Sequence, residues 1–183
     1  QFYESGLATP YTVLSKFDDN GNETWRLAVG SNKGLHVVTD VVATSDGGFY
    51  AVGYGKNVGG KKVNSYYDAF VYKYDAKGNE EWHKLFQTST VDLFYGADLC
   101  SDGGIVVVGS VGNNDGDAAG FNKPDNESAA CIVKYNSNGN IVWKNIVGGN
   151  TDNFNDVCVG KDGNIYCVGE NRRNKCPWCG LEG

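Results

Sequence analysis

The sequence predicts an all-β fold built from repeated antiparallel units of four strands. Three observations lead to this prediction. Two linked motifs recur three times along the chain, the segments between the turns alternate as strands do, and no stretch of helical length shows a helical period with caps.

The first repeated motif joins a strand, a turn and a tryptophan. It occupies residues 13–25, 70–82 and 131–143, and its Lys, Gly and Trp positions coincide in all three copies. Along the second copy, aromatic residues alternate with Val71 and Lys73, which is the period of a strand. A Gly-Asn dipeptide follows, and it favours a hairpin because both residues tolerate a positive φ.

The second motif starts at an Asp-Gly turn and runs into an apolar strand. It occupies residues 45–53, 101–109 and 161–169. The two motifs together give each repeat four short strands. In the first complete repeat we expect these strands at about 37–44, 49–54, 67–75 and 79–87. Repeats of this kind are typical of β-propeller blades, whereas a β-sandwich, the alternative, would not repeat its sequence in register.

The motifs also resemble those of a known family. The pattern is Ala-x-x-x-Lys-Tyr-Asp-x-x-Gly-Asn-x-x-Trp, then Asp-Gly-Gly-x-x-x-x-Gly, and it is similar to the seven-bladed β-propeller repeat of secreted bacterial and archaeal proteins. Residues 114–120 resemble the linker of that family. The resemblance covers about residues 11–170. It implies a β-propeller fold and an extracellular, non-catalytic role at the cell surface, and it implies no particular ligand.

We expect residues 1–183 to form a single domain of blade-type repeats. Its expected parts are a half blade at 11–29, full blades at 36–88 and 91–147, a half blade at 152–170 and a cysteine-containing tail at 171–183. These parts add up to three blade equivalents, whereas propellers close with about four to eight blades.

The two half blades are therefore expected to need completion. Either the chain is part of a longer propeller, or the last hairpin of one copy joins the first hairpin of another, in a ring or a filament. Left open, the ends would expose strand edges and the apolar residues Val13, Phe17, Val157 and Ile165. A three-bladed ring closed within one chain is the remaining alternative.

Composition and processing signals favour an extracellular protein. The formal net charge is −6 and the basic residues are scattered, so the basic patch of a nucleic-acid-binding protein is missing. No apolar run approaches the length of about 18 residues that a membrane span needs. The chain begins at Gln1 and lacks methionine, which predicts processing or a fragment boundary there. Asn22 and Asn126 both start N-glycosylation sequons.

Binding or self-assembly is the expected function, and catalysis is not. His36 and His83 fall at non-equivalent repeat positions, and no nucleophile motif is present. The long loops 55–67 and 111–128 are expected on one face, opposite the Asp-Gly turns, and loops of this kind carry most binding sites. The alternative is a lectin-like, carbohydrate-binding propeller assembled from short chains. Tyr66 and Trp178 are its candidate sugar contacts, whereas the three repeated tryptophans are expected between blades.

Oxygen-bearing side chains give one candidate metal site. Asn113, Asp115 and Asp117 alternate within a long loop and suit Ca²⁺, and we expect no other cofactor. The repeated Asp18, Asp75 and Asn136 are instead predicted to brace their turns through side-chain to backbone hydrogen bonds.

The six cysteines predict disulfides in an extracellular chain. If Asp162 and Gly163 form a two-residue turn, Cys158 faces Cys167 closely enough to bridge. Cys176 and Cys179 form a C-x-x-C motif in the tail, and we expect a local disulfide there. A redox or zinc site would need a helix or a second pair of ligands, and the sequence supplies neither.

Overall fold

The fold is all-β, as the repeats predict. The computed structural model describes residues 12–29, 34–58, 66–121, 128–148 and 152–170. A short 3-10 helix, η2 (Gly116–Ala118), lies between two of the strands. The strands are β1 (Thr12–Phe17), β2 (Glu23–Val29), β3 (Leu35–Ala43), β4 (Phe49–Lys56), β5 (Asp68–Tyr74), β6 (Glu80–Phe86), β7 (Asp92–Leu99), β8 (Ile105–Val111), β9 (Ala129–Tyr135), β10 (Ile141–Val147), β11 (Asn153–Val159) and β12 (Ile165–Glu170).

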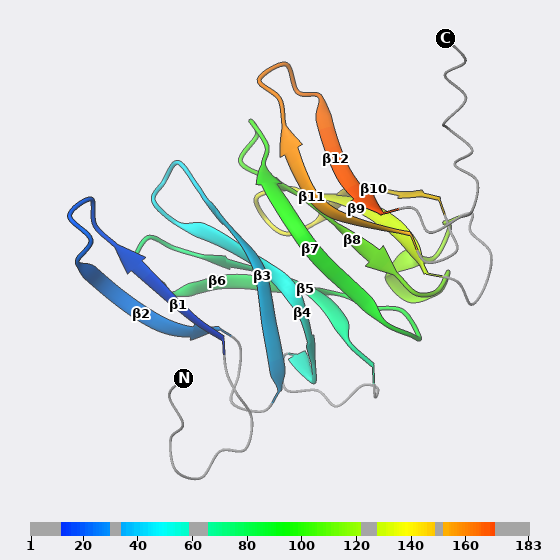
Figure 1. Ribbon diagram of the computed structural model, residues 1–183, viewed down its shortest axis with the longest axis horizontal. Helices are drawn as coiled ribbons and strands as arrows, with labels where there is room; N and C mark the ends of the chain where they lie inside the picture. Colours follow the sequence, from blue (N-terminus) through cyan, green and yellow to red (C-terminus); the bar gives the residue numbers. More distant parts are fainter. Residues whose placement is uncertain (1–11, 30–33, 59–65, 122–127, 149–151, 171–183) are drawn as a thin grey trace.

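The strands form four antiparallel sheets in chain order. We call β1–β2 the N-terminal half-sheet, β3–β6 the first full sheet, β7–β10 the second full sheet and β11–β12 the C-terminal half-sheet. Within each full sheet, consecutive strands are hydrogen-bonded neighbours. Figure 1 shows the sheets stacked side by side, from the blue N-terminal half-sheet to the orange C-terminal one. The predicted succession of a half unit, two full units and a half unit is therefore seen at the level of sheets.

Each tight turn joins its strands through a three-residue loop. In the β5–β6 turn, the Asp75 N–H donates to the Asn79 carbonyl and the Gly78 N–H donates back to the Asp75 carbonyl. Gly78 has a φ of 83°, and the corresponding glycine has a positive φ in every one of these turns. The Asp75 carboxylate accepts the backbone N–H groups of Lys77 and Asn79, so the predicted bracing of the turns is confirmed.

The Asp18 and Asn136 side chains accept hydrogen bonds in the same way. The side-chain hydrogen bond from Asn79, followed by backbone hydrogen bonds, lowers the pKa of Asp75. An ionised carboxylate is therefore favoured at this turn because it accepts several hydrogen bonds at once.

Three apolar clusters fill the spaces between successive sheets. The central strands β5 and β8 are buried along their whole length because sheets cover both of their faces. Polar bonds also join the first strands of neighbouring sheets. The Ala97 N–H donates to Asp40 at 2.9 Å, and the Val159 N–H donates to Asp98 at 2.6 Å.

The repeated tryptophans pack onto the glycine turn of the next sheet. Trp82 lies against Gly139, where an added Cβ would meet the indole ring at 3.0 Å, and its Nε1 donates to the Ser137 carbonyl. Trp25 has the corresponding position against Gly78, so the predicted place between sheets is confirmed for both indoles. Trp143 is 37% exposed, and the prediction does not hold there. The C-terminal half-sheet has only two strands, so it has no counterpart of the glycine turn onto which the other two tryptophans pack.

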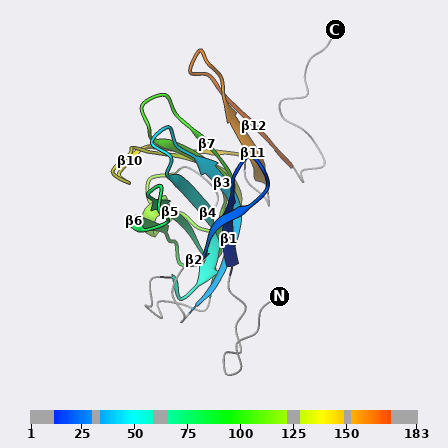
Figure 2. The ribbon, with the colours of Figure 1, turned by 90° about the vertical axis from the view of Figure 1, so that its left-hand side faces the viewer.

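The described strands do not close into a ring. β1 and β12 lie at opposite ends of the stack, and neither pairs with the other (Figure 1). Figure 2 shows the N-terminal end of the stack, with β1 and β2 in front. The ends of β4 and β8, where the two long loops begin, lie on the same side of the stack, away from the tight turns that precede these strands (Figure 1). Residues 59–65 and 122–127 of these loops lie outside the described residues. The described part of the chain contains no helix with the length and hydrophobicity of a membrane span.

Candidate functional site

Each end of the stack consists of half a four-stranded sheet. The N-terminal end has counterparts of the third and fourth strands, and the C-terminal end has counterparts of the first and second strands. In the full sheets, β4 pairs with β5 and β8 pairs with β9. The repeat places β12 in the position of β4 and β8, and β1 in the position of β5 and β9. Each half-sheet consists of two strands only, so these two strand edges are open among the described residues. An open edge presents unpaired backbone groups and invites another strand.

Apolar side chains beside the open edges are exposed. Phe17 on β1 is 58% exposed, whereas its counterparts Tyr74 and Tyr135 are 4% and 1% exposed. Val13 is also exposed, as expected. The expectation was wrong for Val157, which is buried against the second full sheet because it lies on the inner face of β11. Ile165 packs partly into the same cluster.

The outer face of the C-terminal half-sheet presents a different set of residues. Cys158, Tyr166 and Val168 are exposed there, and Tyr166 and Val168 are at least as exposed as Phe17. At the same repeat positions, the full sheets bury Tyr50, Val52 and their counterparts in β8 completely. This face therefore has the composition of an interface and lacks the sheet that would cover it.

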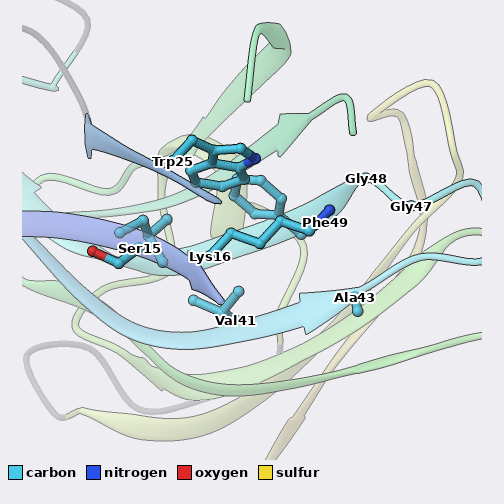
Figure 3. Close-up of a pocket in the computed structure, with 9 residues that line it drawn as sticks. Ser15, Lys16, Trp25, Val41, Ala43, Gly47, Gly48 and Phe49 are labelled. Carbon is cyan, nitrogen blue, oxygen red and sulfur yellow. The ribbon is translucent and has the colours of Figure 1, made fainter. Parts of the chain in front are cut away.

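A pocket opens at the other end of the stack, between the N-terminal half-sheet and the first full sheet. It has a volume of about 180 Å³ and is largely apolar. Its lining residues come from both sheets and are Leu14, Ser15, Lys16, Trp25, Val41, Ala43, Gly47, Gly48 and Phe49. Figure 3 shows Trp25 stacked beside Phe49, with Lys16 and Val41 at the same opening. The two rings are 5.6 Å apart between centroids.

Charged residues follow the same repeat at the open edges. In the second full sheet, Lys134 binds Asp102 at 2.7 Å, and this hydrogen bond is the main reason that the pKa of Asp102 is lowered. In the first full sheet, Lys73 lies 3.8 Å from Asp46. The pairs join the third strand of a sheet to the turn between its first two strands. Lys16 on β1 and Asp162 before β12 have these positions, one at each end of the stack.

The predicted calcium ligands make hydrogen bonds that hold a loop together, and the calcium site stays a prediction. Asp115 accepts the Ser89 N–H at 2.8 Å, and Asp117 accepts the Gln87 N–H at 2.9 Å. Asn113 donates to the Ser89 hydroxyl at 2.7 Å. The described residues contain no cluster of three or more acidic, His or Cys side chains arranged for a metal. These three side chains are therefore explained as braces between the β8–η2 loop and the β6–β7 link.

The predicted bridge between Cys158 and Cys167 is wrong. The Gly160 N–H donates to the Asn164 carbonyl at 2.7 Å and closes a three-residue loop, which shifts the strand register by one residue. Cys158 then pairs with Tyr166 and Cys167 with Val157, so the two thiols lie on opposite faces of the hairpin. Both are free thiols, and burial is the main reason that the pKa of Cys167 is raised.

The remaining predicted site residues are only partly placed. Asn126, Cys176, Trp178 and Cys179 lie outside the described residues. Asn22 is exposed on the β1–β2 turn, where its side-chain amide donates to Asp18 at 3.0 Å. Tyr66 is exposed just before β5.

Several residues of this site were missed at the sequence level. They are Lys16, Tyr166 and the glycines that line the pocket. The signal was available, because each has the same repeat position as a residue inside the stack. No protein-family model matches the chain, and no curated protein matches it at a significant level.

Proposed function

We propose that this chain is a non-catalytic, extracellular or cell-surface module for binding and self-assembly. Its sheets act as β-propeller-type blades, in keeping with the resemblance to seven-bladed repeat proteins. The C-terminal half-sheet of one copy joins the N-terminal half-sheet of the next copy to make a complete four-stranded blade.

The complementarity of the two half-sheets is the observation that carries this proposal. The C-terminal half-sheet has the counterparts of β3 and β4, and the N-terminal half-sheet has the counterparts of β5 and β6. Together they contain every strand of one full sheet and no strand twice. Such a contact is heterologous, so it leads to a closed ring or to a filament.

Physical costs at the open ends support the same proposal. Each large apolar side chain that becomes buried contributes about 1.5–3 kcal/mol, and an exposed strand edge favours pairing with another strand. Phe17, Tyr166 and Val168 are exposed at these ends. Joining the half-sheets would bury these side chains and pair both strand edges.

Light scattering of the intact chain, measured over a range of concentrations, tests the proposal. We expect a native mass that is a multiple of the chain mass. Phe17→Lys should return the protein to a single-chain mass, because the counterparts of Phe17 are buried in both full sheets. Val142→Lys is the matched control, since Val142 is exposed but its repeat position is Glu81 in the first full sheet. A single-chain mass at all concentrations would refute the proposal.

Carbohydrate binding is a second candidate function, and an aromatic cluster favours it. Tyr54 packs edge-on against Tyr67 at 5.5 Å and against Tyr95 at 6.3 Å, next to the long loop that follows β4. The exposed Tyr66 directly precedes Tyr67. Reproducible binding on a glycan array that is lost in Tyr66→Ala would support this function, and an array without any signal would rule it out for the glycans tested.

A further inference from the structure

The pocket beside Trp25 has a filled counterpart inside the same chain. One repeat further along, the residues at the lining positions surround Tyr50, which is fully buried. The Tyr50 hydroxyl donates to the Gly103 carbonyl at 2.9 Å, and its ring lies 5.7 Å from that of Trp82. The Lys73 ammonium lies 5.2 Å from the centre of the Tyr50 ring.

The residues that line the pocket correspond, position by position, to the residues that surround Tyr50. Val71, Ala97 and Ile105 belong to the same apolar cluster as Tyr50, and Trp82 and Leu99 pack against it. The residues at these positions in the pocket are Leu14, Val41, Phe49, Trp25 and Ala43. Val41 is 42% exposed whereas its counterpart Ala97 is 6% exposed, which is the difference that a missing neighbour makes. The pocket is therefore the site of a tyrosine that the N-terminal half-sheet does not supply.

The chain carries that tyrosine at its other end. Tyr166 has the repeat position of Tyr50, and it is 59% exposed on the outer face of β12. From the filled counterpart, we propose that the pocket binds Tyr166 of a second copy of this chain. The Tyr166 ring lies between Trp25 and Lys16, and its hydroxyl donates to the carbonyl of Gly47. This inference rests on the proposed self-assembly and specifies its contact.

The joint between two copies also brings together opposite charges, and the repeat predicts its strand register. Lys16 and Asp162 have the positions of the pair Lys134 and Asp102, so joining two copies brings an ammonium to a carboxylate. Ala51 pairs with Tyr72 in the first full sheet, and Val107 pairs with Val133 in the second. The same register places Cys167 directly opposite Ser15 of the second copy.

One residue departs from the pattern and sharpens the test. Asn164 replaces Gly48 and Gly104, where an added Cβ would meet the carbonyl oxygen of the paired strand, that of Tyr74 at 2.5 Å. The turn end of the joint must therefore open slightly to admit the Asn164 side chain. Asn164→Gly should strengthen association several-fold.

The first measurement compares association constants of variants by light scattering. Tyr166→Ala should weaken association at least a hundredfold, because a central aromatic anchor is lost. Tyr166→Phe keeps the ring and loses one hydrogen bond, so it should weaken association about fivefold. Val142→Ala, at an exposed apolar residue of the second full sheet, should leave association unchanged.

The second measurement traps the register. In a Cys158→Ser background, Ser15→Cys should form a disulfide with Cys167 of another chain on mild oxidation, visible by non-reducing electrophoresis and peptide mapping. Residues directly opposite each other have Cβ atoms about 4.5–5.5 Å apart. Arg26→Cys is the control, because Arg26 pairs with Ser15 on β2 and lies one strand further from the joint.

The outcomes separate this inference from the function on which it rests. A link between chains, together with the loss of association in Tyr166→Ala, supports the pocket as a tyrosine receptor. Undiminished association of Tyr166→Ala without the link would overturn the receptor and leave self-assembly standing. The same link formed within one chain would overturn the second copy as the partner. A chain that never associates would overturn both.

Discussion

At the scale of single residues, the contact between an indole and a glycine explains the most repeated motif. Two separate features require glycine at position 139. Its φ is 76°, and an added Cβ would meet the Trp82 ring at 3.0 Å. Gly163 has a φ of 84° but no atom within 4 Å of an added Cβ. The two positions therefore separate backbone strain from packing.

We predict that Gly139→Ala destabilises the protein more than Gly163→Ala. Alanine at a positive φ costs about 1–2 kcal/mol at either position. Overpacking against Trp82 adds about 1–3 kcal/mol at Gly139 only. Urea denaturation followed by circular dichroism measures both values. Equal losses in the two variants would mean that Trp82 moves away without cost.

His36 is the other residue with an unusual environment. It is buried beside Phe70 and Tyr72, with its Nε2 atom 3.4 Å from the Tyr72 hydroxyl and its Nδ1 atom 3.2 Å from the Gly34 carbonyl. Burial is the main reason that the pKa of His36 is lowered. The folded state therefore favours the neutral imidazole.

We predict that the His36 contribution to stability is lost as the medium becomes acidic. The unfolded chain binds the proton more tightly, so the contribution is complete above the ordinary histidine pKa of about 6.5 and falls as the pH drops below that value. Denaturation of the native protein and of His36→Gln between about pH 5 and pH 8 should differ in slope. Burial raises the pKa of Asp92 to about 7, so Asp92 makes stability fall as the pH rises, which is opposite to the effect of His36. This contribution is the same in both proteins and cancels in the comparison. Parallel curves would contradict the prediction.

At the scale of elements, strand order was predictable and strand register was not. Both motifs contain a turn, and their period predicts the succession of hairpins. The Cys158–Cys167 bridge requires a two-residue loop at Asp162, whereas Gly163 is the last residue of a three-residue loop. A left-handed glycine at the end of a three-residue loop is a recognised hairpin type. One added residue moves every later side chain to the other face, which separated Cys158 from Cys167.

Contacts between distant segments limited the prediction of the loops. The side chains of Asn113, Asp115 and Asp117, predicted as cation ligands, also bond to Gln87 and Ser89, about one strand pair earlier in the chain. Spacing within the loop contains no information about that link. The open edges were foreseeable, because counting hairpins alone shows that each end holds half a unit.

At the scale of the whole molecule, the stack has a direction. Its N-terminal end carries the pocket, and its C-terminal end carries the exposed Tyr166 on β12. Each full sheet covers the next sheet through the same kind of contact, namely a tyrosine or apolar residue of its second strand packed against the following sheet. The proposed joint between copies continues this series without a new type of interface.

Because the pocket and Tyr166 lie at opposite ends, the two ends of each chain differ and copies join head to tail. A chain altered only at Tyr166 keeps a working acceptor but has no donor, so it can be added to one end of a growing polymer and then stops growth there. Small doses of such a terminator would shorten filaments in proportion to the dose. In a closed ring the same doses would remove whole rings, so one titration distinguishes the two architectures.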